Sequence, residues 1–185
     1  MDDALFKMSG LVPVDFDAEN ADNLEDIEKQ FAVKAVQHLE TYWAILQKVK
    51  GSALRLTKMD DDILEHLKTD FPEFDPAATI NEDEMKSKAG KEKWRKFMMA
   101  YEKKIDDYNF GTMLRTSPKV EYEQDTTIFG MDGPSSMFKS ERVQLLTLYR
   151  EITPVPRMQF YAVEIARNRA GLNDWIYEKA KAEKK

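Results

Sequence analysis

A repeating pattern of apolar residues between Lys91 and Arg115 sets the strongest limit on the fold. Its members recur at steps of three and four, which places them on one side of a helix with 3.6 residues per turn. They are Trp94, Phe97, Met98, Tyr101, Ile105 and Tyr108. A helix with one apolar side needs a partner, and a second stripe lies between Arg157 and Gly171. Its members are Met158, Tyr161, Ala162, Ile165 and Ala166. We expect the two helices to pack together.

Length and residue usage indicate a single domain. A chain of 185 residues buries roughly 70% of its unfolded surface when it folds as one unit. The sequence contains no cysteine and only two histidines, which disfavours disulfides, thiolate nucleophiles and metal sites built on these residues. It shows neither a secretory leader nor a run of ~20 apolar residues. We therefore expect a cytoplasmic protein with no membrane contact, and a nuclear pool is left open.

The net charge of −6 hides blocks of opposite sign. Residues Met1–Glu28 hold nine acids against Lys7, and Asp60–Glu84 hold ten against Lys68. Residues Lys86–Lys104 reverse this balance, with eight basic residues against two acids. The molecule is therefore expected to be electrostatically polarised.

The chain divides into three parts. Residues 1–22 are acidic and show no sustained period, so we expect a disordered N-terminal arm. Residues 23–178 carry the helix signals of the single domain, and the lysine-rich residues 179–185 are expected to form a basic C-terminal tail. Within the domain, residues 131–153 look like an insertion, whose pattern favours a helix with a strand as the alternative.

Start and stop signals place the first helices. A capping box at Asn23 begins a long helix that Gly51 ends. A second helix begins at Thr57 or Asp60. It ends near Phe71, because the proline that follows disfavours helical geometry in the residue before it.

The middle of the domain contains the central helix and the only strand signals. A short helical stretch from about Asn81 leads into the central helix, which Asn109–Gly111 should close. Thr112–Arg115 and Thr126–Phe129 are β-prone and predict a two-stranded ribbon.

The last part of the domain is expected to be helical. Pro156 is placed to begin a helix over Arg157–Asn168, and Gly171 is placed to cap it. A final helix around Trp175 should follow. The predicted fold class is mainly α with a minor β part (α+β), a compact helical domain with a small antiparallel β-ribbon.

Motifs of the common enzyme classes are missing from the sequence. It contains no GxxxxGK[ST], GxGxxG, GxSxG or HExxH, which argues against an enzyme of those classes. We therefore predict no catalytic residues, no cofactor and no metal. Asp60–Asp62 could hold magnesium through their carboxylates, but the helix macrodipole also favours three acids in a first turn.

Polar residues follow both apolar stripes, and burial of a stripe does not explain them. They are Asp106, Asp107, Asn109 and Arg115 after the first stripe, and Glu164, Arg167, Asn168 and Arg169 along the second. The paired aspartates could serve acid–base chemistry, but no base is implied by the spacing. Ion pairs with the arginines are the favoured interpretation. We expect these charged ends to face outward as a docking platform.

A basic run overlaps the start of the central helix. It consists of Lys86, Lys88, Lys91, Lys93, Arg95 and Lys96, with Trp94 and Phe97 among them. A mixture of basic and aromatic residues is typical of RNA-binding surfaces. The alternative, which we favour, is a solvated helix face whose aromatic side chains point inward.

Several motifs together resemble one protein family. They are AVQHLETYW (Ala35–Trp43), LTKMDDDI (Leu56–Ile63), KSKAGKEKWRKF (Lys86–Phe97), DYNFGTMLR (Asp107–Arg115), TTIF (Thr126–Phe129) and RMQFYAVEIARNRAG (Arg157–Gly171). The family is the small eukaryotic group called polysaccharide biosynthesis domain-containing protein 1. The resemblance covers most of Lys29–Asn173 in the same order. The family pattern passes almost directly from TIF to PR-x-QF, which is why residues 131–153 look inserted.

The resemblance implies a chaperone rather than sugar chemistry. Family members are thought to be ribosome-associated and to protect the GTP-binding domain of nascent translation elongation factor 1-alpha. The implied partners are this nascent factor and the ribosome, with a possible RNA contact. Because the sequence lacks an ATPase motif, any such action must draw on binding energy and end with the client's own folding.

This implied role suggests two surfaces. The ribosome or another acidic partner would meet the basic run. The client would meet the polar helix ends, namely Asp106, Asp107, Arg115, Arg157, Glu164, Arg167, Asn168 and Arg169. The alternative is that these polar groups lock the two helices together.

Two other functions stay open at this point. A glycan-modifying enzyme or methyltransferase would suit the family's historical name, but such enzymes need a parallel sheet and a glycine-rich cofactor loop. An RNA-binding accessory factor would show steeply salt-dependent binding to RNA.

Overall fold

The structure is a computed structural model that describes residues 21–106, 108, 110–128 and 155–184. Most of the acidic segment 1–22 and the whole of 131–153 lie outside the described residues, as do Asp107 and Asn109. The described chain is mainly helical with two small antiparallel β-pairs, which confirms the predicted fold class.

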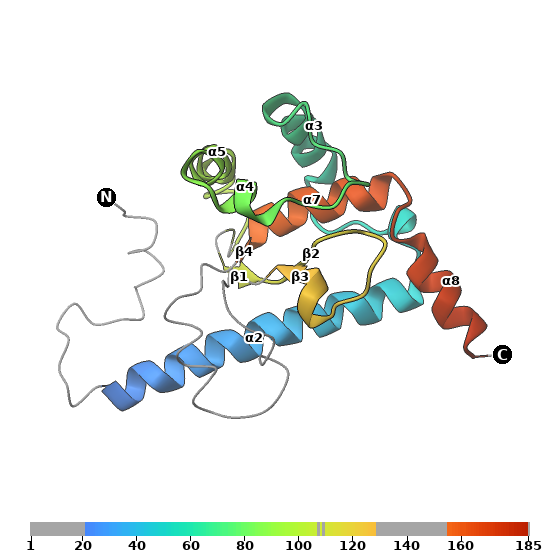
Figure 1. Ribbon diagram of the computed structural model, residues 1–185, viewed down its shortest axis with the longest axis horizontal. Helices are drawn as coiled ribbons and strands as arrows, with labels where there is room; N and C mark the ends of the chain where they lie inside the picture. The colour runs from blue at the N-terminus through green and yellow to red at the C-terminus, as the bar shows by residue number, and fades with distance from the viewer. Residues whose placement is uncertain (1–20, 107, 109, 129–154, 185) are drawn as a thin grey trace.

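The first helix, α2 (Ala21–Lys48), is a rod that runs along one side of the molecule (Figure 1). It buries Ala35, Tyr42 and Leu46 on one face. The helix ends just before Gly51, as predicted, and a short 3-10 turn, η3 (Gly51–Ala53), follows.

The second helix, α3 (Asp60–Asp70), begins and ends at the expected residues. The Asp60 carboxylate accepts hydrogen bonds from the backbone N–H groups of Leu56 (2.9 Å) and Thr57 (2.6 Å). The helix stops at Phe71, immediately before Pro72.

Two short helices follow in the order the sequence predicted. The side chain of Asn81 caps α4 (Glu82–Lys86), and the side chain of Ser87 caps α5 (Lys88–Met99). The apolar stripe is confirmed, because Trp94, Phe97 and Tyr101 are buried together in the core.

The predicted length of the central helix is wrong. The α-helix ends at Met99, and the chain continues to Asp106 in turns and a bend, with the Tyr101 N–H donating to the Met98 carbonyl at 2.9 Å. The physical reason is a tertiary contact further on. The carbonyls of Tyr108 and Phe110 accept from the backbone at the start of the last core helix at 2.8 and 2.7 Å. A straight helix would carry them away from that contact.

The predicted β-ribbon is present. Strand β2 (Leu114–Arg115) pairs antiparallel with β3 (Thr127–Ile128), which follows the short 3-10 turn η4 (Gln124–Thr126). A second pair joins β1 (Gly111–Thr112) to β4 (Val155–Pro156), and the sequence did not predict it. Two-residue strands leave too short an alternation to detect.

The helix α7 (Arg157–Arg169) lies at the centre of the molecule (Figure 1). Figure 1 shows α3, α4 and α5 on one side of it and α2 on the other. Pro156 precedes its first residue, and Gly171, with φ of 69°, follows its end as predicted. The last helix, α8 (Asp174–Ala182), includes residues 179–182 of the expected tail and packs on α2.

The expected pairing of the two apolar stripes is confirmed, since Phe97 and Tyr101 share a core with Met158 of α7. The other side of α7 packs on α2, where the rings of Phe160 and Tyr42 meet edge to face with centroids 5.1 Å apart. The helix that organises the fold is therefore α7 rather than α5.

Two substitutions on α5 test this packing. Phe97 is fully buried, so Phe97→Ala should lower the free energy of unfolding by about 3–4 kcal/mol. Met99 is 46% exposed, so Met99→Ala should change it by no more than about 0.5 kcal/mol. Chemical denaturation measures both, and equal effects would contradict the described face of α5.

Candidate functional site

A fully buried carboxylate, that of Glu164 on α7, lies at the centre of the described domain. The guanidinium of Arg167 donates to it at 2.8 Å, and that of Arg115 donates at 3.1 Å. Tyr42 donates its hydroxyl at 2.8 Å and Asn173 donates its amide at 2.9 Å. Four segments thus meet at one charged group, namely α2, β2, α7 and the turn before α8.

Two asparagines extend this network. The side-chain amide of Asn173 donates to the side-chain oxygen of Asn168 at 2.7 Å, and the side-chain amide of Asn168 donates to the Tyr42 hydroxyl at 3.2 Å. A Cβ atom at Gly51 would lie 2.6 Å from the Asn168 side-chain oxygen. Gly51 is therefore needed for close approach of the backbone to the network.

The two arginines also bind backbone carbonyls. Arg115 donates to the carbonyls of Pro118 and Val120, and its guanidinium lies 5.6 Å from the ring centroid of Trp43. Arg167 donates to the carbonyl of Arg115 at 3.0 Å. These bonds hold the loop after β2 against α7, so the network fixes backbone as well as side chains. We name the network of Tyr42, Arg115, Glu164, Arg167, Asn168 and Asn173 the buried polar centre.

The electrostatics of the buried polar centre favour one charge state. Burial by itself raises the pKa of Glu164, but the adjacent guanidinium groups of Arg115 and Arg167 lower it to about 2. Burial and the Glu164 charge both raise the pKa of Tyr42 well above its ordinary value. Glu164 is therefore ionised at neutral pH and Tyr42 is a neutral donor.

The prediction that the charged ends face outward is wrong for four residues. Arg115, Glu164, Arg167 and Asn168 are 2% exposed or less. Their mutual contacts make them a structural lock, which is the alternative the sequence left open. The lock joins α7 to α2 and β2 rather than to α5.

The other candidate residues at the helix ends lie elsewhere. Asp106 is exposed and pairs with no arginine of the described chain, so the ion pair expected for it is wrong, while Asp107 lies outside the described residues. Arg169 instead pairs with Asp61 of α3 at 2.6 Å. The guanidinium of Arg157 lies 5.0 Å from the ring centroid of Phe110.

Two members of the buried polar centre, Tyr42 and Asn173, were missed by the sequence analysis. Tyr42 stands at helical spacing among apolar residues of the long first helix, a position that accounts for its ring, which packs on Phe160, but not for its hydroxyl. Asn173 follows a glycine turn, where asparagine is common for local reasons. No sequence signal separates those local roles from a long-range one.

The basic run extends from the end of α4 along α5, and its members on α5 form an exposed face. Lys88, Lys91, Lys93, Arg95 and Lys96 are exposed, and Lys86 pairs with Glu82. Trp94 stacks on Phe71, with ring centroids 4.2 Å apart, and points into the core. The favoured interpretation, a solvated face with inward aromatics, is confirmed.

The three aspartates at the start of α3 do not form a metal site. Asp60 is buried and accepts from the preceding loop, whereas Asp61 pairs with Arg169. Over the part of the chain that the structure describes, no group of acidic and histidine side chains could hold a metal ion. Within the same residues, no helix is both long and apolar enough to cross a membrane.

These features define a class, a small α+β domain whose helices close around a buried ionised carboxylate. The family model described as "PBDC1 protein" matches residues 27–133 and 142–178. The chain therefore belongs to the PBDC1 family. The break between the two matches, residues 134–141, falls inside the segment 131–153.

Similar proteins are known in yeasts and in mammals. The chain is 55% identical to "Protein PBDC1 homolog" of Schizosaccharomyces pombe, over 86% of this chain and 94% of the relative. It is 34% identical to "Protein PBDC1" of Homo sapiens, over 86% of this chain and 58% of the human protein. A solution NMR structure of protein yst0336 from Saccharomyces cerevisiae is 50% identical, with a TM-score of 0.65. That match covers 88% of this chain and 97% of the yeast chain.

Substitution of two arginines in the last turn of α7 tests whether Arg167 is a structural residue while Arg169 is an ordinary surface charge. Arg167→Ala should lower the free energy of unfolding by about 3 kcal/mol or more, because it leaves buried polar groups without their partner. Arg169 forms a solvent-exposed ion pair with Asp61. Arg169→Ala should therefore lower the free energy of unfolding by less than about 1 kcal/mol. Denaturant titration measures both, and similar losses would contradict the assignment.

The buried carboxylate also predicts a dependence of stability on pH. The folded-state pKa of Glu164, about 2, is lower than its ordinary value of 4.5. The ionised group therefore stabilises the fold above pH 4.5, and this contribution is lost as the pH falls toward 2. Glu164→Gln should be less stable than the wild type at pH 7, and the difference should shrink in that window. A difference that stays constant with pH would count against the ionised carboxylate.

Proposed function

We propose that this protein is an ATP-independent chaperone that binds the GTP-binding domain of nascent elongation factor 1-alpha at the ribosome. Membership of the PBDC1 family makes this the function to test first. The observation that carries the proposal is the exposed basic face of α5, which lies on a chain of net charge −6. A basic face on an acidic protein orients the molecule toward a polyanion such as the ribosome.

The proposed contact with the ribosome is electrostatic. Trp94 and Phe97 point inward, so α5 offers lysines and arginine to phosphates but no aromatic ring of its stripe for stacking on bases. Binding should therefore depend on salt and not on sequence. This favours a factor located at the ribosome over one that reads a particular RNA.

The proposed client contact uses surface that the fold leaves accessible. Among the candidate residues at the helix ends, Asp106 and Arg169 keep exposed side chains. The buried members Arg115, Glu164, Arg167 and Asn168 serve the client surface only by holding the domain in shape. Release of the client follows from its own folding, because a folded GTP-binding domain hides the segments that were bound.

Selective isolation of ribosome–nascent-chain complexes, with sequencing of the bound messages, tests this proposal. The wild type should enrich the message for elongation factor 1-alpha at positions where its GTP-binding domain has emerged. Lys88→Glu, Lys91→Glu and Lys96→Glu together should remove the protein from ribosomes without changing its melting temperature. A matched control changes three lysines outside α5 to glutamate, namely Lys58, Lys68 and Lys119, all of which are exposed. This control should still co-sediment with ribosomes.

Either of two results would contradict the proposal. An even distribution over all messages would exclude the named client. Unchanged co-sedimentation of the α5 variant would exclude the basic face as the ribosome contact.

A further inference from the structure

A groove of about 540 Å³ lies between the 71–81 loop and the helices α4, α5 and α7. Its apolar wall consists of Phe71, Phe74, Ile80, Met85, Trp94 and Val163. Within this wall, Phe71 and Trp94 stack on each other with ring centroids 4.2 Å apart. The groove lies away from the buried polar centre, and none of its lining residues takes part in that network.

The loop that forms one side of the groove is held in place. The Ile80 N–H donates to the Thr116 carbonyl at 2.8 Å, and the Asp75 side chain accepts from the Ala77 N–H at 2.9 Å. Two prolines, Pro72 and Pro76, further restrict the backbone of this loop. The groove is thus part of the folded domain, and an occupant does not have to order the loop first.

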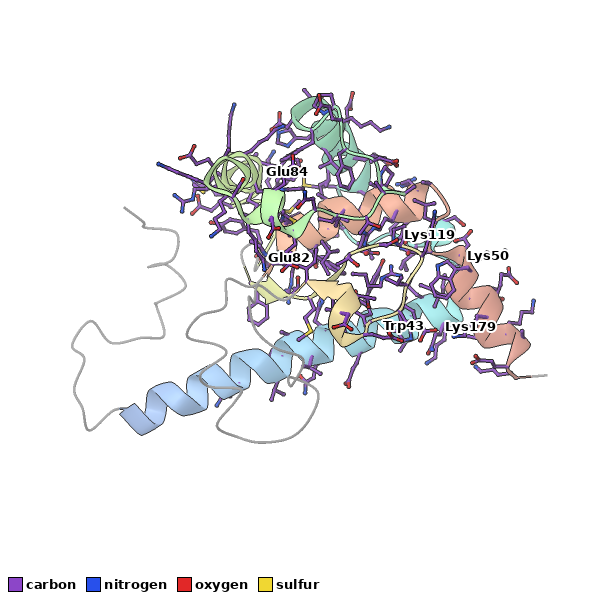
Figure 2. The ribbon with its side chains drawn as sticks, viewed as in Figure 1. Trp43, Lys50, Glu82, Glu84, Lys119 and Lys179 are labelled. Carbon is purple, nitrogen blue, oxygen red and sulfur yellow. The ribbon has the colours of Figure 1, made fainter. Side chains whose placement is uncertain are left out.

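The rim of the groove is acidic. Glu73, Asp75 and Glu84 line it and are exposed, and they form no ion pair with any residue that the structure describes. One cation, Lys93, also lines the groove, but its ammonium group lies 4.5 Å from the ring centroid of Phe71. Three carboxylates against one ammonium favour a cationic occupant. Figure 2 labels Glu84 on α4, where its neighbour Glu82 is paired with Lys86.

We propose that this groove binds an extended peptide segment in which an apolar side chain is flanked by lysine or arginine. The apolar side chain fills the space against Trp94 and Met85, and the flanking cations meet Glu73 and Glu84. Under the proposed function, such a segment belongs to the unfolded client, so this assignment of the groove rests on that function. Unfolded chains expose apolar residues beside charged ones, whereas folded domains bury the apolar member.

The basic face and the groove would then act on different partners. The ribosome, a polyanion, is attracted to the exposed lysines of α5, and the acidic rim repels it. A cationic segment of a nascent chain is attracted to the acidic rim of the groove and repelled by the lysines of α5. Because the two surfaces carry opposite charge, binding of the ribosome at the groove and binding of the cationic segment at the basic face are both disfavoured.

Peptide binding to the full-length protein tests the proposal. The probe is a fluorescein-labelled peptide Gly-Ser-Lys-Phe-Lys-Ser-Gly, with two matched peptides that carry glutamate for both lysines or serine for phenylalanine. Fluorescence anisotropy should show binding of the first peptide and at least roughly tenfold weaker binding of the other two. Equal binding of the lysine and glutamate peptides would overturn the proposal.

Variants of the protein locate the contact. Glu73→Lys with Glu84→Lys should weaken binding of the lysine peptide by roughly tenfold, since rim charges act through attraction and not through the fold. The control, Asp83→Lys with Glu92→Lys, makes the same change of charge at exposed residues that do not line the groove. Because exposed charges away from the groove contribute little to binding, this control should change the dissociation constant of the lysine peptide by less than about twofold. Equal weakening by the two pairs would overturn the proposal.

A third variant blocks the space itself. Ala78 is exposed and lines the groove, so Ala78→Trp should abolish peptide binding while the melting temperature stays unchanged. Retained binding would place the peptide elsewhere. Message enrichment by ribosome-bound wild type is read separately, so loss of the groove assignment leaves the proposed function standing. If the enrichment is absent, the proposed function is wrong, and the peptide measurements then decide only whether the groove binds cationic segments.

Discussion

The attraction between one buried carboxylate and two buried guanidinium groups determines how this domain is assembled. Glu164 is fully buried, and its charge lies against the guanidinium groups of both Arg115 and Arg167. An ionised group buried without partners would be very unfavourable, so the elements that carry the arginines must be in place when α7 is buried. The contact therefore couples β2 to α7 across 49 residues of sequence.

Such a network specifies a structure more than it stabilises one. Apolar replacements of a buried ion pair are often neutral, whereas removal of one partner is costly. In this domain the apolar contacts of Phe97, Phe160 and Leu46 supply the driving force for folding. The network then selects one arrangement of α2 and α8 about α7, because only that arrangement satisfies Tyr42 and Asn173.

This division of roles explains what the sequence could and could not predict. Periodicity located α2, α3, α5 and α7, and local start and stop signals located the end of α2 and both ends of α3 and α7, because both kinds of signal lie within a few residues. The predicted cap of α2, Asn23, is wrong, since the helix already begins at Ala21. The length of the central helix was wrong, because a contact with α7 bends the chain after Met99. Arg115 and Glu164 were identified as unusual. Their burial could not be deduced, since a charged residue in a sequence looks the same whether solvent or a distant partner balances it.

The charged side chains that stay outside the buried polar centre define the surface of the domain. Two accessible charged features of opposite sign lie on the described surface, apart from the charges that α7 takes into the core. One is the basic face of α5, and the other is the acidic rim of the groove beside it. Two surfaces of opposite charge on one small domain suit a protein that holds one partner by electrostatics while it receives another.

The most direct test of the buried polar centre is hydrogen exchange of the arginine side chains, measured by NMR on the wild-type protein. If Arg115 and Arg167 are held by Glu164, their guanidinium protons should exchange slowly and give separate resonances. Arg55, whose side chain is 61% exposed, should exchange fast and give an averaged signal. Guanidinium protons of Arg115 and Arg167 that exchange as fast as those of Arg55 would contradict the account.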